Sequence, residues 1–279
     1  MQKSHENFRQ LAIIGATASG KTSLAIKVAQ KIDAYILSLD SLAVYKEIDI
    51  VSAKPTLDER QNVQHFGIDL IYPNEPFNVN IFINLYKDVY KRCLHDHKNL
   101  VVVGGTGFYL KMLIDGISEI PKVSNKTHSD AQAHLNDLGE TYRWLSSLDK
   151  TYMSNIESTD SYRIEKALYI YLESGLTPSK YFALHPPKAT ITEPLPIYQI
   201  LWDKEALRKR ITLRTSLMID EGIIDEVCFL EKKYGRAPNS MKSIGIKETL
   251  AYLDGIYDKK TLTQKITTNT ARLAKRQNT

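Results

Sequence analysis

The 279-residue sequence has few of the residues that build metal centres or covalent crosslinks. Its two cysteines, Cys93 and Cys228, are far apart, and neither belongs to a C-x-x-C pair or a His/Cys cluster. This excludes the common zinc patterns and argues against a disulfide. No apolar run is long enough to span a bilayer, and the opening stretch MQKSHENFRQ has no apolar segment of the signal-peptide kind. We therefore expect a cytoplasmic protein that does not enter a membrane.

The sequence also lacks internal repeats and low-complexity tracts, and its 43% hydrophobic and 25% charged residues are typical of a globular protein. The net charge of +5 is unevenly distributed. Lys204–Thr279 contains 16 Lys and Arg against 9 Asp and Glu, whereas the preceding 203 residues contain 21 against 23. This basic C-terminal part is either a set of solvated helix faces or an electrostatic footprint for a polyanion such as RNA.

Short apolar strands followed by helices recur along the chain, as in LAIIGATASGKTSLAIKVAQKI, AYILSLDS and NLVVVGGTGFYLKMLIDGI. This alternation predicts an α/β fold with a parallel sheet flanked by helices and ligands at the carboxyl ends of the strands. Because the first strand is followed by the P-loop pattern GATASGKT, we expect the fold to be P-loop NTPase-like. We expect residues 1–117 and 196–279 to form this core, with YQILW returning as a strand. The polar, helix-patterned residues 118–195 predict an all-helical insertion domain.

The stretch GATASGKT fits the P-loop pattern G-x-x-x-x-G-K-[ST], with Gly15, Ala16, Thr17, Ala18, Ser19, Gly20, Lys21 and Thr22. Glycines let the backbone turn its N–H groups toward phosphate oxygens, and the following helix offers its positive N-terminus to the same anion. Lys21 adds a charge, and the Thr22 hydroxyl suits Mg²⁺. The motif indicates phosphate binding but does not specify a reaction.

Further candidates follow the other strands. Asp40 could hold Mg²⁺, act as a general base, or cap a helix that DSLAVYKEI would begin. The Gly104-Gly105-Thr106 turn suggests a second set of phosphate contacts. Arg210 and Arg214 are four residues apart on one predicted helix face. They suit a pyrophosphate group, although an ordinary basic surface helix has the same pattern.

The motifs GATASGKT, DSLAVY with AKPT, GGTGFYLKMLIDGIS and LAKRQ occur in this order and closely resemble the bacterial tRNA dimethylallyltransferases, or tRNA isopentenyltransferases. The resemblance implies transfer of a dimethylallyl group from dimethylallyl pyrophosphate to N6 of the adenosine 3′-adjacent to the anticodon in tRNA, with release of pyrophosphate. It implies that the P-loop holds the donor's pyrophosphate, with Mg²⁺ near Thr22. The expected partners are dimethylallyl pyrophosphate and the anticodon stem-loop of tRNA, and we expect a monomer.

The same resemblance implies roles for individual residues. Asp40 matches the general base or acceptor for the adenine N6 amine, while Thr106 and Arg214 match residues that stabilise the leaving pyrophosphate. The implied tRNA-binding residues are Asp40, Ser41, Leu42, Ala43, His128, Tyr162, Arg163, Lys166, Lys242 and Lys247. The chain departs from the family pattern where Ala16 replaces a proline, where Lys166, Lys242 and Lys247 replace arginines, and where His128 falls near a tRNA-contacting arginine.

Three other functions fit parts of the pattern. A small-molecule kinase using ATP would also need a P-loop and an acid such as Asp40. An isopentenyltransferase acting on free AMP or ADP would share the donor site, but the insertion and the basic C-terminal part favour a larger polyanionic acceptor. A non-enzymatic RNA-binding protein would not need Lys21, Asp40 and Arg214 together.

Overall fold

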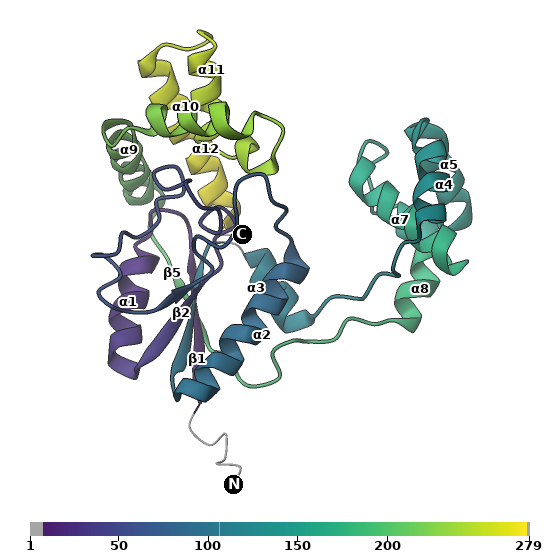
Figure 1. The fold of residues 1–279 in the computed structure, drawn as a ribbon, viewed down its shortest axis with the longest axis horizontal. Coiled ribbons are helices and arrows are strands. Elements are labelled where there is room, and N and C mark those ends of the chain that lie inside the picture. Colours follow the sequence, from purple (N-terminus) through teal and green to yellow (C-terminus); the bar gives the residue numbers. More distant parts are fainter. Residues whose placement is uncertain (1–7, 106, 278–279) are drawn as a thin grey trace. The chain divides into compact units, whose positions relative to one another are not determined.

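A computed structural model describes residues 8–105 and 107–277 of the chain (Figure 1). Thr106, one of the predicted catalytic residues, lies outside the described residues. The chain divides into two units, one made of the described residues of Met1–Met112 and Ile191–Thr279, and the other of Leu113–Thr190. Among the described residues, no helix has both the length and the apolar character needed to cross a bilayer.

A five-stranded parallel sheet lies at the centre of the first unit, with the strand order β3-β2-β4-β1-β5. The strands are β1 (Gln10–Gly15), β2 (Ala34–Ser38), β3 (His65–Phe66), β4 (Asn99–Gly104) and β5 (Ile197–Ile200). The central strands β2, β4 and β1 are apolar and largely buried, as expected for a parallel sheet covered on both faces. The predicted α/β class is confirmed.

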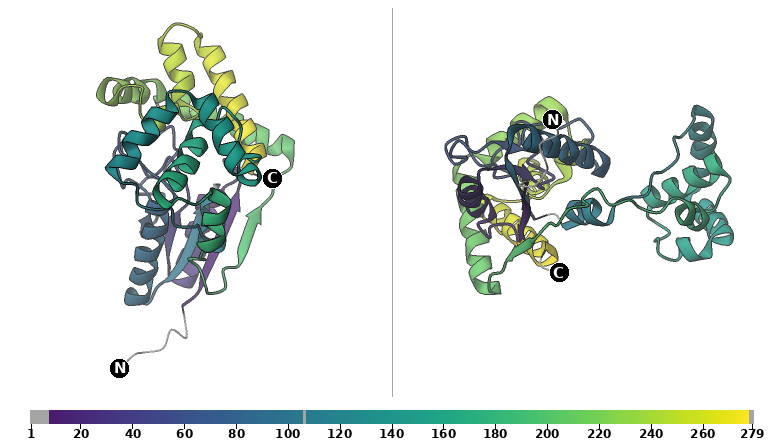
Figure 2. Two further views of the ribbon diagram at one scale, coloured as in Figure 1. Left: turned by 90° about the vertical axis from the view of Figure 1, so that its right-hand side faces the viewer. Right: turned by 90° about the horizontal axis from the view of Figure 1, so that it is seen from below.

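Helices cover both faces of this sheet (Figures 1 and 2). On one face, α1 (Lys21–Ile32) packs Ala25, Ile26 and Ala29 against the strands. On the other face, α2 (Val79–Asp96) contacts β2 and β4, and α3 (Gly107–Asp115) packs beside it through the stacked rings of Phe82 and Tyr109. These helices leave the carboxyl ends of β1, β2 and β4 in one region.

The C-terminal helices continue the same unit beyond the sheet. They are α9 (Lys204–Asp220), α10 (Ile223–Tyr234), the short η1 (Asn239–Lys242), α11 (Ile246–Leu253) and α12 (Lys259–Gln277). Helices α9 and α12 pack together, and Ala16 of the P-loop is buried against Leu207, Ile211 and Ala274 from these two helices. The C-terminal helices therefore form part of the P-loop's surroundings, although they are far from it in sequence.

The segment after β2 forms turns, and the helix that DSLAVYKEI could have begun is absent there. The physical reason is tertiary. Tyr45, Ile48 and Val51 pack into a core with residues of α10, α11 and α12. The Glu226 carboxylate of α10 accepts hydrogen bonds from the backbone N–H groups of residues 49, 50 and 51 at 2.8, 2.7 and 3.0 Å. These bonds fix the turn that follows the DSLAVYKEI stretch to the first turn of α10.

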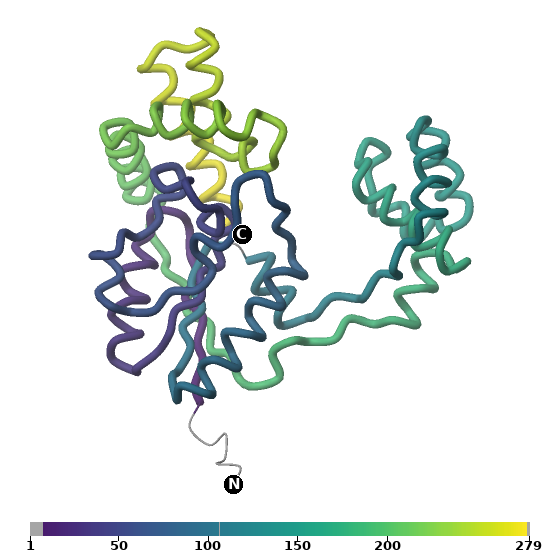
Figure 3. Tube along the Cα trace, viewed as in Figure 1, coloured from purple at the N-terminus to yellow at the C-terminus, as the bar shows by residue number. Residues whose placement is uncertain are grey.

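The second unit is built mainly of five helices and can be followed along the chain in Figure 3. They are α4 (Asn125–Leu135), α5 (Leu138–Leu148), α6 (Lys150–Met153), α7 (Ser161–Ser174) and α8 (Pro178–Leu184). Its core contains Leu145, Met153, Ile164 and Leu168, all buried. This unit has its own core and accounts for the polar, helix-patterned part of the sequence.

Candidate active site

The P-loop curls between β1 and α1 in a conformation that only particular residues adopt easily. Gly20 caps α1 with φ of 88°, and Ala18 has φ of 62°. A Cβ on Gly15 would lie 2.9 Å from the Ile200 carbonyl oxygen, so glycine is required there. The buried Ser19 hydroxyl has no hydrogen-bond partner among the described residues. A buried hydroxyl inside a curled loop at a helix N-terminus fits an anion's oxygen atoms.

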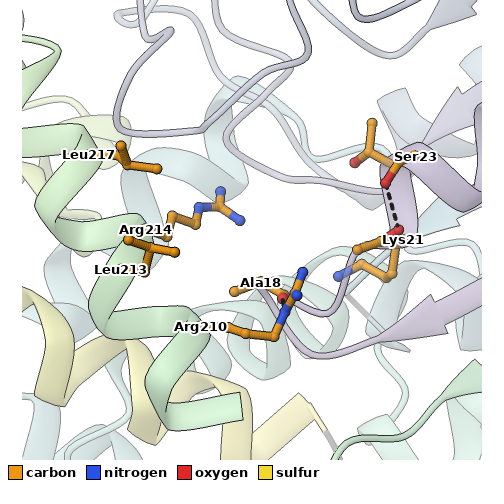
Figure 4. Close-up of a pocket in the computed structure, with 9 residues that line it drawn as sticks. Ala18, Lys21, Ser23, Arg210, Leu213, Arg214 and Leu217 are labelled. Atoms are coloured by element: carbon orange, nitrogen blue, oxygen red, sulfur yellow. Dashed lines mark hydrogen bonds between the residues drawn. The ribbon is translucent and has the colours of Figure 1, made fainter. Parts of the chain in front are cut away.

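Three cations surround this loop (Figure 4). Lys21 comes from the start of α1, and Arg210 and Arg214 extend from α9; all three line a cavity of about 310 Å³ with Thr22. The Lys21 ammonium donates a hydrogen bond to the Ala16 carbonyl at 2.6 Å. Burial lowers the pKa of Lys21 to about 8; the nearby Asp40 opposes this change and Arg214 adds to it. The positive charges of these three side chains therefore lie close together, in a cavity where water solvates them only in part.

The outer side of the P-loop is held by side chains that follow β5. The Arg210 guanidinium stacks over the Trp202 ring at 4.6 Å and donates to the Ala18 carbonyl at 2.7 Å. The Trp202 indole N–H donates to the Ser19 carbonyl at 3.0 Å. These bonds hold the carbonyl groups of Ala18 and Ser19 against the side chains of Arg210 and Trp202.

A second cavity, of about 210 Å³, contains Asp40. One Asp40 carboxylate oxygen accepts hydrogen bonds from the N–H groups of Leu42 at 2.8 Å and Ala43 at 3.2 Å. Asp40 thus caps a turn, not a helix, and still faces the cavity with Ser41 and Leu42. Ala43 is buried and is not part of the cavity lining. The remaining lining is mixed. Its apolar side chains come from Val51, Ile211, Met218, Ile244, Ile266 and Leu273, and its polar ones from Thr17, Ser52, Arg214, Thr215, Ser243, Thr270 and Gln277.

Arg214 lines both cavities. Its guanidinium lies 3.4 Å from the Thr17 hydroxyl. Burial lowers the pKa of Arg214, and the carboxylates of Asp40 and Glu221 oppose that change. The arginine remains charged at any pH at which the protein is folded, because its ordinary pKa is so high. A permanent cation therefore stands between the P-loop and Asp40.

The two glycines after β4 have different neighbours. A Cβ on Gly104 would lie 2.5 Å from Cβ of Leu39, so this glycine permits the close packing of β4 against the end of β2. A Cβ on Gly105 would instead meet the side chain of Gln277, at the end of α12. The sequence suggested an anion contact at both glycines, whereas the packing explains Gly104 without one.

Four of the predicted tRNA-binding residues lie in the helical unit, where Lys166 and His128 contact Tyr169 of α7 and Tyr162 lies against Lys166. Lys166 lies over the rings of Tyr162 and Tyr169, with its ammonium 5.3 and 5.1 Å from their centroids. The His128 ring nitrogen, from α4, lies 3.1 Å from the Tyr169 hydroxyl. The fourth residue, Arg163, is exposed and pairs with Asp160 at 3.4 Å. Tyr169 itself is buried and Lys166 is half-buried, whereas Tyr162 and His128 are exposed. Exposed aromatic rings beside basic side chains are suited to unstacked bases and phosphates.

Lys242 and Lys247 are exposed and flank residues 243–245, which line the Asp40 cavity. Lys247 also borders a hollow of about 470 Å³ on α11 and α12, together with Lys265 and Arg272. The only acidic residue in that lining, Glu248, is buried and accepts from the Gly245 N–H and the Asn269 side chain. The hollow therefore presents mainly positive charge to solvent.

Sequence reasoning did not single out Trp202, Ser243 or Gln277 as site residues. Trp202 has no motif around it that would reveal a role. Ser243, whose buried hydroxyl has no hydrogen-bond partner among the described residues, lies between the predicted tRNA-binding residues Lys242 and Lys247, but nothing in that stretch distinguishes it. Gln277 ends the LAKRQ motif, which was a usable signal, but only its neighbours in space show what it contacts.

Comparison with known families agrees with this geometry. A family model described as IPP transferase matches residues 43–279, and one described as isopentenyl transferase matches residues 9–70. The chain belongs to the IPP transferase family. The membership predicted from the sequence motifs is thereby confirmed, and the protein is a transferase.

Relatives of this IPP transferase extend over nearly the whole chain. The tRNA dimethylallyltransferase of Sulfurovum sp. (strain NBC37-1) is 62% identical over 275 residues, which cover 99% of this chain and 91% of the relative. The tRNA isopentenylpyrophosphate transferase of Bacillus halodurans has a similar structure, with a TM-score of 0.70 and 28% identity, covering 97% of this chain and 86% of that one. A eukaryotic dimethylallyltransferase acting on tRNA gives a TM-score of 0.85 at 25% identity, covering 96% and 69% respectively.

Proposed function

We propose that this IPP transferase transfers a dimethylallyl group from dimethylallyl pyrophosphate to N6 of the adenosine on the 3′ side of the anticodon in tRNA. The observation that carries the proposal is the shared wall of the two cavities. Arg214 separates a cation-lined P-loop from a cavity that contains Asp40. A donor whose pyrophosphate lay in the P-loop would have its reactive carbon directed toward the carboxylate.

The proposed step is a substitution at C1 of the donor. The adenine N6 nitrogen forms a bond to C1, the bond from C1 to the pyrophosphate oxygen breaks, and its electron pair leaves with pyrophosphate. Asp40 accepts a hydrogen bond and then a proton from the N6 amine. Lys21, Arg214 and the P-loop N–H groups stabilise the charge that develops on the leaving group. We assign Thr106 to the same leaving group on its motif alone.

We propose Mg²⁺ as the divalent ion of this site, near Thr22. The exposed Thr22 side chain lines the P-loop cavity and offers one hydroxyl oxygen. The described residues contain no group of three or more His, Cys, Asp or Glu side chains that could hold a metal. Such a site suits Mg²⁺, which keeps several waters and binds through a substrate's phosphates. The bound ion would offset negative charge on the pyrophosphate.

We assign the acceptor to tRNA rather than to free AMP or ADP. Two regions support this assignment. One is the group of Tyr162, His128 and Lys166 around the buried Tyr169 in the helical unit, and the other is the exposed pair Lys242 and Lys247 beside the Asp40 cavity. A free nucleotide would need neither. The target base must leave the anticodon-loop stack to reach the carboxylate, as bases do in other base-modifying enzymes. We propose that the protein acts as a monomer in the cytoplasm, where its RNA substrate is found.

A transfer assay tests the proposal. Protein, Mg²⁺, unmodified tRNA and radiolabelled dimethylallyl pyrophosphate are incubated together, with AMP-acceptor and ATP-hydrolysis reactions in parallel. We expect label on tRNA at the adenosine beside the anticodon, and no label on a matched tRNA with guanosine at that position. Label on AMP alone would indicate a free-nucleotide acceptor, and ATP hydrolysis without transfer would indicate a kinase-type reaction.

A further inference from the structure

Gln277, at the end of α12, lies where the P-loop and the loop after β4 meet. Its side-chain oxygen Oε1 accepts a hydrogen bond from the backbone N–H of Thr17 at 2.8 Å, across 260 residues of sequence. The N–H of Thr17 belongs to the phosphate-binding motif. A side chain from the far end of the chain therefore occupies one donor of the P-loop.

The same amide group covers Gly105. A Cβ on Gly105 would lie 2.5 Å from Gln277 Nε2, 2.9 Å from Cδ and 3.2 Å from Oε1, and these are its three nearest atoms. Because Gly105 does not have a positive φ, its backbone would accept alanine. The space beside this glycine is thus taken up by the amide, and the absence of a side chain there allows the contact.

The packing of helix α12 on the P-loop fixes the position of Gln277. Three residues earlier on α12, Ala274 is buried against Ala16 of the P-loop. Gln277 also lines the cavity that contains Asp40 and Arg214. The amide is therefore partly buried, anchored by its helix, and in reach of both loops that surround the proposed leaving group.

We propose that Gln277 is a positioning residue that joins the P-loop to the loop after β4 and so sets the separation of the two loops that hold the pyrophosphate. The inference rests on the proposed transfer reaction, because it assigns pyrophosphate to these loops. Oε1 orients the Thr17 peptide, and the planar amide packs on Gly105. The residue acts through the two loops and takes no part in bond making.

The first test measures the binding of inorganic pyrophosphate with Mg²⁺ by calorimetry. Gln277→Ala should weaken binding about fivefold, the equivalent of one neutral hydrogen bond of about 1 kcal/mol. The KM for dimethylallyl pyrophosphate should rise in parallel, while the Kd for tRNA and the Tm stay unchanged. Asn80→Ala removes an exposed amide from α2 and should leave all four quantities at wild-type values.

A double-mutant cycle makes the test specific to the contact. Gly105→Ala should displace the Gln277 amide and weaken pyrophosphate binding by about as much as Gln277→Ala. The double variant should bind no more weakly than Gln277→Ala alone, because the clash has been removed. Losses that add in the double variant would show separate roles for the two residues and would overturn the inference, as would unchanged binding in Gln277→Ala.

The cycle also separates this inference from the proposed function. A wild-type protein that fails to bind pyrophosphate would contradict the assignment of the P-loop. A wild-type protein that binds it, with no coupling between residues 105 and 277, would contradict only the role of Gln277.

Discussion

The two cavities that share Arg214 differ in the rest of their lining. The P-loop cavity is lined by Lys21, Arg210 and the exposed side chain of Thr22, together with two leucines of α9. The other cavity has the single carboxylate of Asp40 among apolar and uncharged polar side chains. Cations lie where the proposed reaction releases negative charge, and the carboxylate lies where it releases a proton. The arrangement separates leaving-group stabilisation from activation of the amine, and each can be perturbed alone.

The largest effect is expected at Asp40. Asp40→Asn keeps the shape and one acceptor oxygen but removes the base, so kcat should fall about 10³-fold. The Kd values for tRNA and for pyrophosphate should change little. Single-turnover transfer and filter binding measure these quantities, and Asp225→Asn, an exposed acid of α10, serves as the control. Wild-type turnover in Asp40→Asn would refute the role of the carboxylate.

Arg214→Ala should have the next largest effect, because this residue borders both cavities. We expect kcat to fall about 10²-fold, in the range for loss of one preorganised group at a developing charge. Arg210→Ala should cost less, since its guanidinium is bonded to a loop carbonyl and its side chain is exposed. Equal losses in the two variants would remove the distinction between a residue that contacts the leaving group and one that supports the loop.

The pH dependence of pyrophosphate binding tests the role of the charge on Lys21 in the P-loop cavity. Burial lowers the pKa of Lys21 to about 8, and an anion favours the charged lysine. Pyrophosphate should therefore bind with uptake of a proton, and its affinity should fall about tenfold from pH 7 to pH 9 as the lysine loses its charge. In Lys21→Arg the side chain stays charged, so this variant reports the titration of pyrophosphate itself. The same pH profile for both proteins would contradict a role for Lys21 protonation.

The smallest effect is expected outside the two cavities. Lys242→Ala combined with Lys247→Ala should weaken tRNA binding about fivefold and lower the slope of log K against log salt by about 1.5. Pyrophosphate binding should not change. The pair Lys232→Ala and Lys260→Ala removes the same charge from other exposed positions and should leave the slope unaltered. An unchanged slope in the first pair would show that those lysines do not contact phosphate.

Local sequence patterns predicted much of this site. The P-loop, the strand before it and the helix after it are adjacent in sequence, so their geometry follows from glycine conformation and apolar periodicity. The turn after β2 was less predictable. A helix start was one of the options at Asp40. The turns found there instead pack Tyr45, Ile48 and Val51 against α10, α11 and α12, which lie in a different part of the chain.

The sequence by itself determined the glycine-containing loop between β1 and α1, the carboxylate after the second strand, the α/β class and the family, because each depends on residues close together in the chain. Only the tertiary structure decided that Arg214 stands between the two cavities, that Trp202 holds the back of the P-loop, and that Gln277 closes the gap to Gly105. These contacts join residues that are far apart in the sequence, such as Trp202 and Ser19 at 183 positions and Gln277 and Thr17 at 260 positions. Sequence periodicity does not predict which side chains meet at such separations.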